Sequence, residues 1–209
     1  MTPTVHPTIT LKAIVAPSRR CYGGSMSLLP ELIPGQIGLV VGPRAERMTM
    51  LELSARLALQ GPVRVLDGGN SYNALYVARY VRRQTVQLTE TLNRIQLARA
   101  FTCYQVVTLL EQTAVSAQPT LILDLLATFY DESVDLQEAH RLLRQVVCHL
   151  HRLRRLAPVI VSLRPPPAQQ PDRAGLRHPL EKIADHLLIR EAGETAVHQP
   201  ALFQERLNG

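Results

Sequence analysis

The chain alternates between two patterns of hydrophobic and polar residues. Short, almost continuously apolar runs are separated by longer stretches in which apolar residues recur every three or four positions. Strands that are apolar on both faces are typical of a parallel sheet covered by helices, and their alternation with helical patterns predicts an α/β fold. The predicted strands are 37–41, 63–66, 95–99, 120–124 and 159–163, and the predicted helices are 49–59, 73–83, 102–115 and 136–156.

The C-terminal part departs from this alternation. A proline-rich segment, 164–179, follows the strand 159–163 and is predicted to be a long loop. Segments 185–190 and 195–198 then predict the two arms of an antiparallel hairpin around Ala192-Gly193. We therefore expect a mostly parallel sheet flanked by helices, with an antiparallel hairpin at its C-terminal end.

Composition narrows the class of protein. A chain of 209 residues with 46% hydrophobic residues is expected to form one globular domain. No apolar run is long enough to span a bilayer, and no basic-then-apolar leader opens the chain, so we expect no membrane partner. The three widely spaced cysteines match no metal-binding pattern and indicate a reducing compartment. An intracellular protein is predicted, cytoplasmic or nucleoid-associated, or nuclear in a eukaryote.

The loop that follows the first predicted strand is laid out like a phosphate-binding loop. The pattern G-x-x-x-x-G-K-[ST] would place its first glycine at Gly42 and its hydroxyl residue at Thr49. Its second glycine is replaced by Arg47, and its lysine by Met48. Two matches at the ends of an eight-residue motif are weak evidence alone, so the rest of the chain has to decide.

Several segments, in their order and spacing, resemble the RecA/RadA recombinase superfamily, specifically the archaeal and eukaryotic recombinases and their diverged paralogs. Roughly residues 25–190 are covered, and the similar segments are 33–37, 64–67, 95–101, the Walker B-like strand 121–124, and 127–138. The resemblance implies a RecA-like P-loop NTPase core at residues 25–209, preceded by an N-terminal extension at 1–24.

The departures from this family concentrate on ATP chemistry. Besides Met48, the position of the family's catalytic glutamate falls at about Gly69, and the strand that ends in Asn-Gln in the family ends here in Leu163-Arg164. ATP and Mg²⁺ are therefore disfavoured as cofactors, and no catalytic residue is predicted. The degenerate nucleotide site would comprise Gly42, Arg44, Arg47, Met48, Thr49 and Asp124.

Two residues of this degenerate site have alternative explanations. Thr49 is either a magnesium ligand or, with Glu52, the start of a capping box, and the capping box is preferred. Asp124 either marks a ligand site at the end of a central strand or pairs locally with a neighbouring group.

Positive charge gathers in the C-terminal half. The net charge is +6, and the tract 139–180 holds eight arginines but one acid, Asp172. Since a solvated face normally mixes charges of both signs, the tract predicts contact with DNA phosphates. The candidate DNA-binding residues are Arg141, Arg144, Arg152, Arg155, Arg164, Arg173 and Arg177.

Three functions follow as hypotheses. The first is a non-catalytic recombinase paralog that binds DNA, an active recombinase or another paralog, as part of an oligomer or hetero-complex that assists recombination and repair. The second is a divergent ATPase in which Arg44 or Arg47 replaces the lysine. The third is an assembly scaffold without DNA binding.

Overall fold

The computed structural model of the chain describes residues 33–190. Its strands and α-helices follow the alternating pattern of the sequence, with three short 3-10 helices, η1 to η3, between them. In chain order the elements are β1 (Ile37–Val41), η1 (Pro43–Glu46), α1 (Arg47–Gln60), β2 (Val63–Asp67), α2 (Ala74–Arg82), α3 (Leu88–Asn93), β3 (Ile95–Arg99), α4 (Cys103–Gln112), β4 (Thr120–Leu123), η2 (Ala127–Tyr130), α5 (Leu136–Leu153), β5 (Val159–Leu163), η3 (Pro171–Arg177), α6 (His178–Ile183) and β6 (His186–Ile189).

The six strands form one sheet in the order β3-β2-β4-β5-β1-β6, and every pair is parallel. All residues of β1, β4 and β5 are buried, which explains their continuously apolar sequences. The edge strands β3 and β6 are only partly covered. The predicted α/β class, with a parallel sheet flanked by helices, is confirmed.

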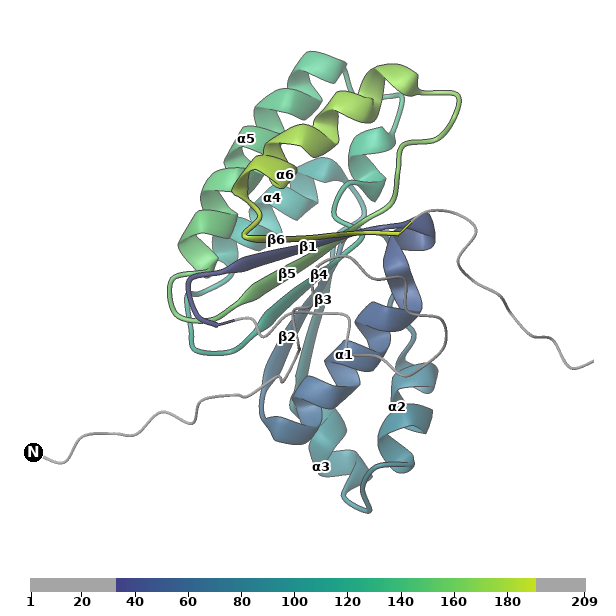
Figure 1. The fold of residues 1–209 in the computed structure, drawn as a ribbon, viewed down its shortest axis with the longest axis vertical. Helices are drawn as coiled ribbons and strands as arrows, with labels where there is room; N and C mark the ends of the chain where they lie inside the picture. The colour runs from purple at the N-terminus through teal and green to yellow at the C-terminus, as the bar shows by residue number, and fades with distance from the viewer. Residues whose placement is uncertain (1–32, 191–209) are drawn as a thin grey trace, which may run out of the picture.

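Helices cover both faces of this sheet. Helices α4, α5 and α6 lie on one side, and α1, α2 and α3 lie on the other (Figure 1). Each side has its own apolar core: Phe129, Leu143 and Leu150 belong to the first, and Met50, Leu57 and Val77 to the second. The apolar stripe of segment 136–156 therefore faces the sheet as its spacing predicts.

The proline-rich segment is only partly a loop. Residues 171–183 form η3 and α6, each with a proline in its first turn. Proline is tolerated there because the first turn's N–H groups have no partner within the helix. The prediction of a loop through 179 is therefore wrong from Pro171 onward.

The C-terminal hairpin is not seen. Its first arm corresponds to β6, which pairs with β1 in parallel, Leu187 lying opposite Leu39. The second arm, 195–198, lies outside the described residues. Among the helices at positions 33–190, none is both long enough and apolar enough to cross a membrane.

Candidate functional site

The candidate site lies where the carboxyl ends of the parallel strands meet. Gly42 follows β1, Gly68 and Gly69 follow β2, Asp124 follows β4, and Arg164 follows β5. Ligands of open α/β sheets bind at this edge. The fold therefore brings the degenerate phosphate loop and the residue after the Walker B-like strand to the same side of the sheet.

The loop between β1 and α1 has an unusual backbone. Arg44, Ala45 and Glu46 all lie in the left-handed region, with φ angles of 54°, 54° and 47°. A non-glycine residue in this region costs on the order of 1 kcal/mol. Three in succession require compensation, and the buried Ala45 methyl and the contacts of Glu46 supply it.

The carboxylate of Glu46 lies back across this loop against Gly42. A Cβ atom built on Gly42 would stand 2.7 Å from Glu46 Oε1, so a side chain at position 42 would require the Glu46 carboxylate to move. Arg190 donates to Glu46 Oε2 at 2.9 Å, and the Thr49 hydroxyl donates to the same oxygen at 3.3 Å. The loop thus holds an anion of its own, neutralised by an arginine that follows β6.

This arrangement corrects the predicted role of Thr49. Helix α1 begins at Arg47, two residues earlier than expected, and its N-cap is Glu46. Thr49 lies inside the helix and donates its hydroxyl proton to Glu46, while Glu52 instead accepts a hydrogen bond from Tyr76 at 2.8 Å. The capping box of Thr49 and Glu52 is therefore wrong.

The cationic residues of the loop point to solvent. Met48 is 50% exposed, and Arg44 and Arg47 are also exposed. No hydrogen bond or ion pair joins either arginine side chain to another residue within 33–190. In this conformation a triphosphate at the loop would meet the Glu46 carboxylate and would find neither a lysine nor an arginine held toward it.

Asp124 is fully buried and paired with Arg164. Its Oδ2 accepts hydrogen bonds from Arg164 Nε at 2.5 Å and from Arg164 Nη2, and its backbone N–H donates to Ser162 Oγ at 3.0 Å. This pair raises the pKa of the Arg164 guanidinium. Of the two explanations for Asp124, local pairing describes this geometry.

The space around Asp124 also explains Gly69. A Cβ atom at position 69 would lie 2.6 Å from both Asp124 Cβ and Oδ2. A glutamate therefore does not fit at position 69, where the resemblance to the recombinase superfamily placed the catalytic residue. The second Asp124 oxygen, Oδ1, is buried and has no hydrogen-bond partner in the described part of the chain.

Tyr130 completes this cluster from the other side. Its hydroxyl donates to the Arg164 carbonyl at 3.1 Å. Burial raises the pKa of Tyr130, and the Asp124 charge acts in the same direction. Tyr130 therefore stays a neutral hydrogen-bond donor that holds the segment after β5.

Sequence reasoning missed Asp67, Glu46 and Arg190. The buried Asp67 accepts from the backbone N–H groups of Ser71 and Tyr72, both at 2.9 Å, and lies 3.4 Å from Arg99 Nε. It closes the turn after β2, for which the Asp-Gly-Gly-Asn sequence was an available signal. No local signal marks the contact of Glu46 with Arg190, because the two are 144 positions apart.

The seven predicted DNA-binding arginines do not share one free surface. Arg173 is only 6% exposed and donates to the carbonyls of Phe129 and Val134, which corrects its assignment as a phosphate contact. Arg152 donates to the carbonyls of Leu110 and Glu111 at the end of α4. Both guanidinium groups serve the fold.

The remaining five differ in how much charge they leave free. Arg141 pairs with Glu138 at 2.7 Å and Arg177 with Glu181 at 2.6 Å. Arg164 pairs with Asp124. Of these five arginines, Arg144 and Arg155 are exposed and form no ion pair with another residue of 33–190. The acids that pair with the other three arginines lie just outside the tract 139–180 or far from it in sequence. The scarcity of acids within the tract therefore overstated how many of its arginines are left unpaired.

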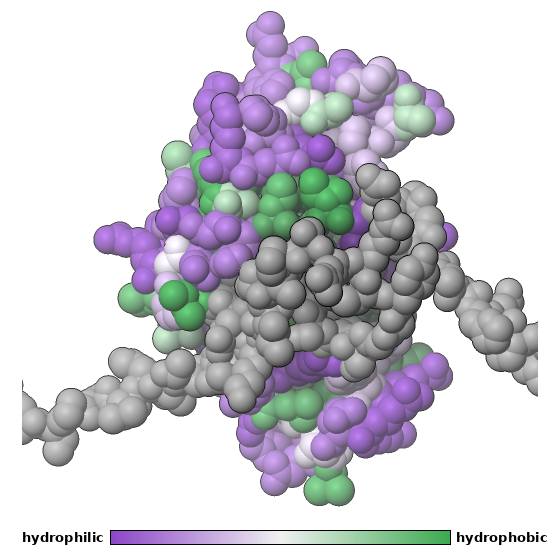
Figure 2. Space-filling view, viewed as in Figure 1, coloured by the Kyte–Doolittle hydropathy of each residue, from purple (hydrophilic) through white to green (hydrophobic). Residues whose placement is uncertain are grey.

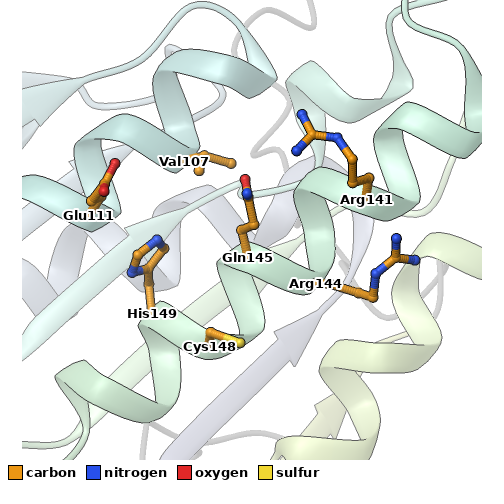
Figure 3. A pocket seen from close by; sticks show the side chains of 7 residues that line it. All are labelled: Val107, Glu111, Arg141, Arg144, Gln145, Cys148 and His149. Carbon is orange, nitrogen blue, oxygen red and sulfur yellow. The ribbon is translucent and has the colours of Figure 1, made fainter.

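A shallow groove of about 470 Å³ runs between α4 and α5. Arg141, Arg144, Cys148 and His149 line it from α5, while Val107 and Glu111 face them from α4 (Figure 3). Burial lowers the pKa of His149, and the nearby Arg152 charge adds to this effect. His149 is therefore neutral near pH 7, and the groove mixes both charge signs.

The geometry defines the class of protein as an α/β protein with an all-parallel sheet. At the carboxyl edge of this sheet, the carboxylate of Glu46 occupies the loop between β1 and α1. Within residues 33–190, no three His, Cys, Asp or Glu side chains gather closely enough to hold a metal ion. No protein-family model matches the chain, and a search of curated proteins finds no match.

Proposed function

We propose that the chain is a non-catalytic, RecA/RadA-like recombinase paralog. It assists homologous recombination and DNA repair by binding DNA, an active recombinase or recombinase paralog, or both, within an oligomer or hetero-complex. The observation that carries this proposal is the Glu46 carboxylate held across the loop between β1 and α1.

The charges at the strand ends argue for association rather than turnover. Phosphoryl transfer needs positioned positive charge around the transferred phosphate. Here Arg190 is engaged by Glu46, Arg164 is engaged by Asp124, and the position of the expected lysine is Met48. Each strong cation at the site is already neutralised or points to solvent.

The backbone frame supports the family assignment. A buried strand, a glycine-started loop and a helix follow one another at 37–60, as in a phosphate-binding unit, and the Walker B-like strand β4 ends at the same edge of the sheet. A strand, loop and helix whose charged groups pair with one another, and not with a nucleotide, are suited to a subunit that other proteins bind.

An exposed apolar patch supports a protein partner. Leu97 on β3, Phe101 after it and Tyr104 in the first turn of α4 are 40%, 63% and 50% exposed. β3 is an edge strand, and no strand of the described residues pairs with its outer side. That side is therefore free to receive another chain. This patch fits the docking of a recombinase or a paralog subunit.

The alternative is a divergent ATPase, and the specific observation in its favour is the exposure of Arg44 and Arg47 beside the loop. Either arginine would have to displace the Glu46 carboxylate to reach a phosphate. The scaffold without DNA binding is the third candidate, favoured by the internal use of Arg152, Arg164 and Arg173.

Calorimetric titration of the full chain with ATP and Mg²⁺, followed by a phosphate-release assay, tests the proposal. We expect neither binding in the micromolar range nor phosphate release. A pull-down from native extract is expected to retain a recombinase. Micromolar binding with phosphate release would replace the proposal by the divergent ATPase.

A further inference from the structure

Three arginines lie close together on α2 and at its C-cap. Arg79, Arg82 and Arg83 are exposed, and none forms an ion pair or a side-chain hydrogen bond within residues 33–190. By contrast, Arg99 at the end of β3, Arg164 after β5 and Arg190 after β6 all contact carboxylates. A cluster of three unneutralised cations in one helical turn therefore needs an explanation of its own.

No acid is close along the chain to neutralise this cluster. Residues 68–89 contain no aspartate or glutamate. Across the helix pair, Glu52 is engaged by Tyr76, and Glu90 on α3 is paired with Arg94 at 2.6 Å. A solvated helix face normally mixes charges of both signs, whereas the charged residues of α2 itself are all arginines; the carboxylate beside it, Glu52 on α1, keeps its charge because its partner Tyr76 is neutral.

Helix α1 adds a fourth cation to the same surface. Arg56 donates from Nε to the Tyr80 hydroxyl at 2.8 Å, so its guanidinium lies beside α2. In Figure 2 the surface where Figure 1 places α2 is mainly hydrophilic. The result is a basic surface, formed by Arg56, Arg79, Arg82 and Arg83, on the opposite side of the sheet from the predicted arginine tract of α5.

We propose that this basic surface on α2 binds the phosphate backbone of a nucleic acid. This inference rests on the DNA-binding branch of the proposed function and moves the contact away from α5. Arginines at i, i+3 and i+4 rise about 4.5–6 Å along a helix, a spacing that long guanidinium side chains adapt to successive phosphates of one strand.

The composition of the surface favours a polyphosphate over an acidic protein. Arginine is enriched in protein interfaces as well, so the preference for a polyphosphate rests on the three like charges within one helical turn, which match the closely spaced phosphates along a strand. The two aromatic residues of α2, Tyr76 and Tyr80, are half-buried and hold Glu52 and Arg56 through their hydroxyls, so α2 presents no fully exposed ring for base stacking. Binding is therefore electrostatic, independent of base sequence and strongly dependent on salt.

The test is fluorescence anisotropy of the full chain with a labelled single-stranded oligonucleotide across a salt series. The variant is Arg79→Ala/Arg82→Ala/Arg83→Ala, in which alanine preserves the helix. The matched control, Arg141→Ala/Arg144→Ala/Arg155→Ala, removes the same charge from α5 and the turn that follows it. We expect the α2 variant to weaken binding tenfold or more, on the order expected for three lost phosphate contacts, and to flatten the salt slope by about 2.

The control variant is expected to bind within about threefold of the wild type, since its arginines are not the contacting ones. A second variant, Arg79→Lys/Arg82→Lys/Arg83→Lys, is expected to keep most of the salt slope because it keeps the charge. Circular dichroism of each variant verifies the fold. If the alanine variant unfolds, the lysine variant still tests the inference, because a folded lysine variant with no affinity for the oligonucleotide would contradict a purely electrostatic contact.

Equal losses in the two alanine variants would overturn the inference, because net charge alone would then explain binding. Equal competition by polyglutamate and by unlabelled oligonucleotide would also overturn it, in favour of any polyanion. A wild type that binds no DNA at low salt would overturn the inference but leave the recombinase-docking branch of the proposed function. Measured ATP turnover would instead overturn the non-catalytic character of the proposed function and leave the inference about the basic surface on α2 standing.

Discussion

Single residues decide the chemistry at the carboxyl edge of the sheet. Sequence comparison with a phosphate-binding loop draws attention to Met48, but the structure makes Glu46 at least as important. A missing lysine removes an attraction for a polyphosphate, whereas a carboxylate held across the loop adds a repulsion. The loop therefore departs from the phosphate-binding pattern in two ways, of which the sequence motif shows only one.

Restoring the lysine alone is predicted not to restore hydrolysis. In Met48→Lys the new ammonium group has the Glu46 carboxylate within the same loop as a partner, and Gly69 still provides no catalytic carboxylate. We expect phosphate release to stay at the background rate in a coupled assay. Substantial turnover in this single variant would show that the catalytic base lies elsewhere than at position 69.

Gly69 is predicted to be intolerant of any side chain. In Gly69→Ala the new methyl group would stand 2.6 Å from Asp124 Cβ, and overpacking of this kind costs about 1–3 kcal/mol of stability. Gly175→Ala is the matched control, because nothing lies within 4 Å of its built Cβ atom. Urea unfolding of both variants measures the difference, and equal midpoints would contradict the close approach of Asp124.

The Arg164 and Asp124 pair is predicted to contribute to stability. Arg164→Ala leaves a buried carboxylate without its cation, which costs less than the 3–5 kcal/mol of a fully buried pair because Arg164 is 41% exposed; we expect about 2 kcal/mol. Arg141→Ala, which breaks an exposed pair with Glu138, should cost less than about 1 kcal/mol. Denaturant unfolding compares the two, and equal losses would contradict the burial argument.

At the scale of elements, strands were the easiest feature to predict. The runs 37–41 and 159–163 match β1 and β5 at both ends, because central parallel strands are covered on both faces and carry apolar residues throughout. The run 95–99 also matches β3 at both ends, although β3 is a partly covered edge strand. Helix ends were harder. Helix α1 begins at Arg47 because three left-handed residues and the Glu46 contacts place its N-cap, and none of these is a local sequence preference.

The short helical elements near the C-terminus show the limit of composition. Pro171 and Pro179 indicated a loop, but each lies in the first turn of a helical element. Arg173 fixes η3 by donating to two carbonyls more than 35 positions away. Whether an arginine is buried or free depends on such distant partners, so the arginine count of a segment did not identify a binding surface.

Arg152 is predicted to stabilise the junction of α4 and α5. Its guanidinium donates at 2.7 Å and 3.0 Å to the carbonyls of Leu110 and Glu111 in the last turn of α4, where the Leu110 carbonyl also accepts from the Thr113 N–H at 3.3 Å. Arg152→Ala should cost about 1–2 kcal/mol. The exposed Arg155, changed to alanine, should alter stability by less than about 0.5 kcal/mol. Thermal unfolding of both variants compares them, and a neutral Arg152→Ala would contradict the capping role.

At the scale of the whole molecule, the net charge of the chain does not show where unpaired cations lie on its surface. The sequence has a net charge of +6 and places eight arginines between 139 and 180, yet the fold engages most of these through carbonyls or carboxylates. The unneutralised cluster lies on α2, across the sheet from that tract. A sequence shows how many cations a protein has, and folding decides which of them remain for a partner.

The same distinction predicts how the whole molecule responds to nucleotide. A ligand that binds only the folded state stabilises it by RT ln(1 + [L]/Kd), which is about 2.7 kcal/mol at a hundredfold excess over Kd and raises the melting temperature by several degrees. Because Glu46 and Asp124 are already neutralised by Arg190 and Arg164, the folded chain gains nothing from a triphosphate with Mg²⁺. We expect the melting temperature with millimolar ATP and Mg²⁺ to equal that with Mg²⁺ and an equal ionic strength of sodium chloride. A rise specific to ATP would mean that Arg190 releases Glu46 when nucleotide arrives, and Glu46→Gln should then enlarge the rise by removing the repelling charge.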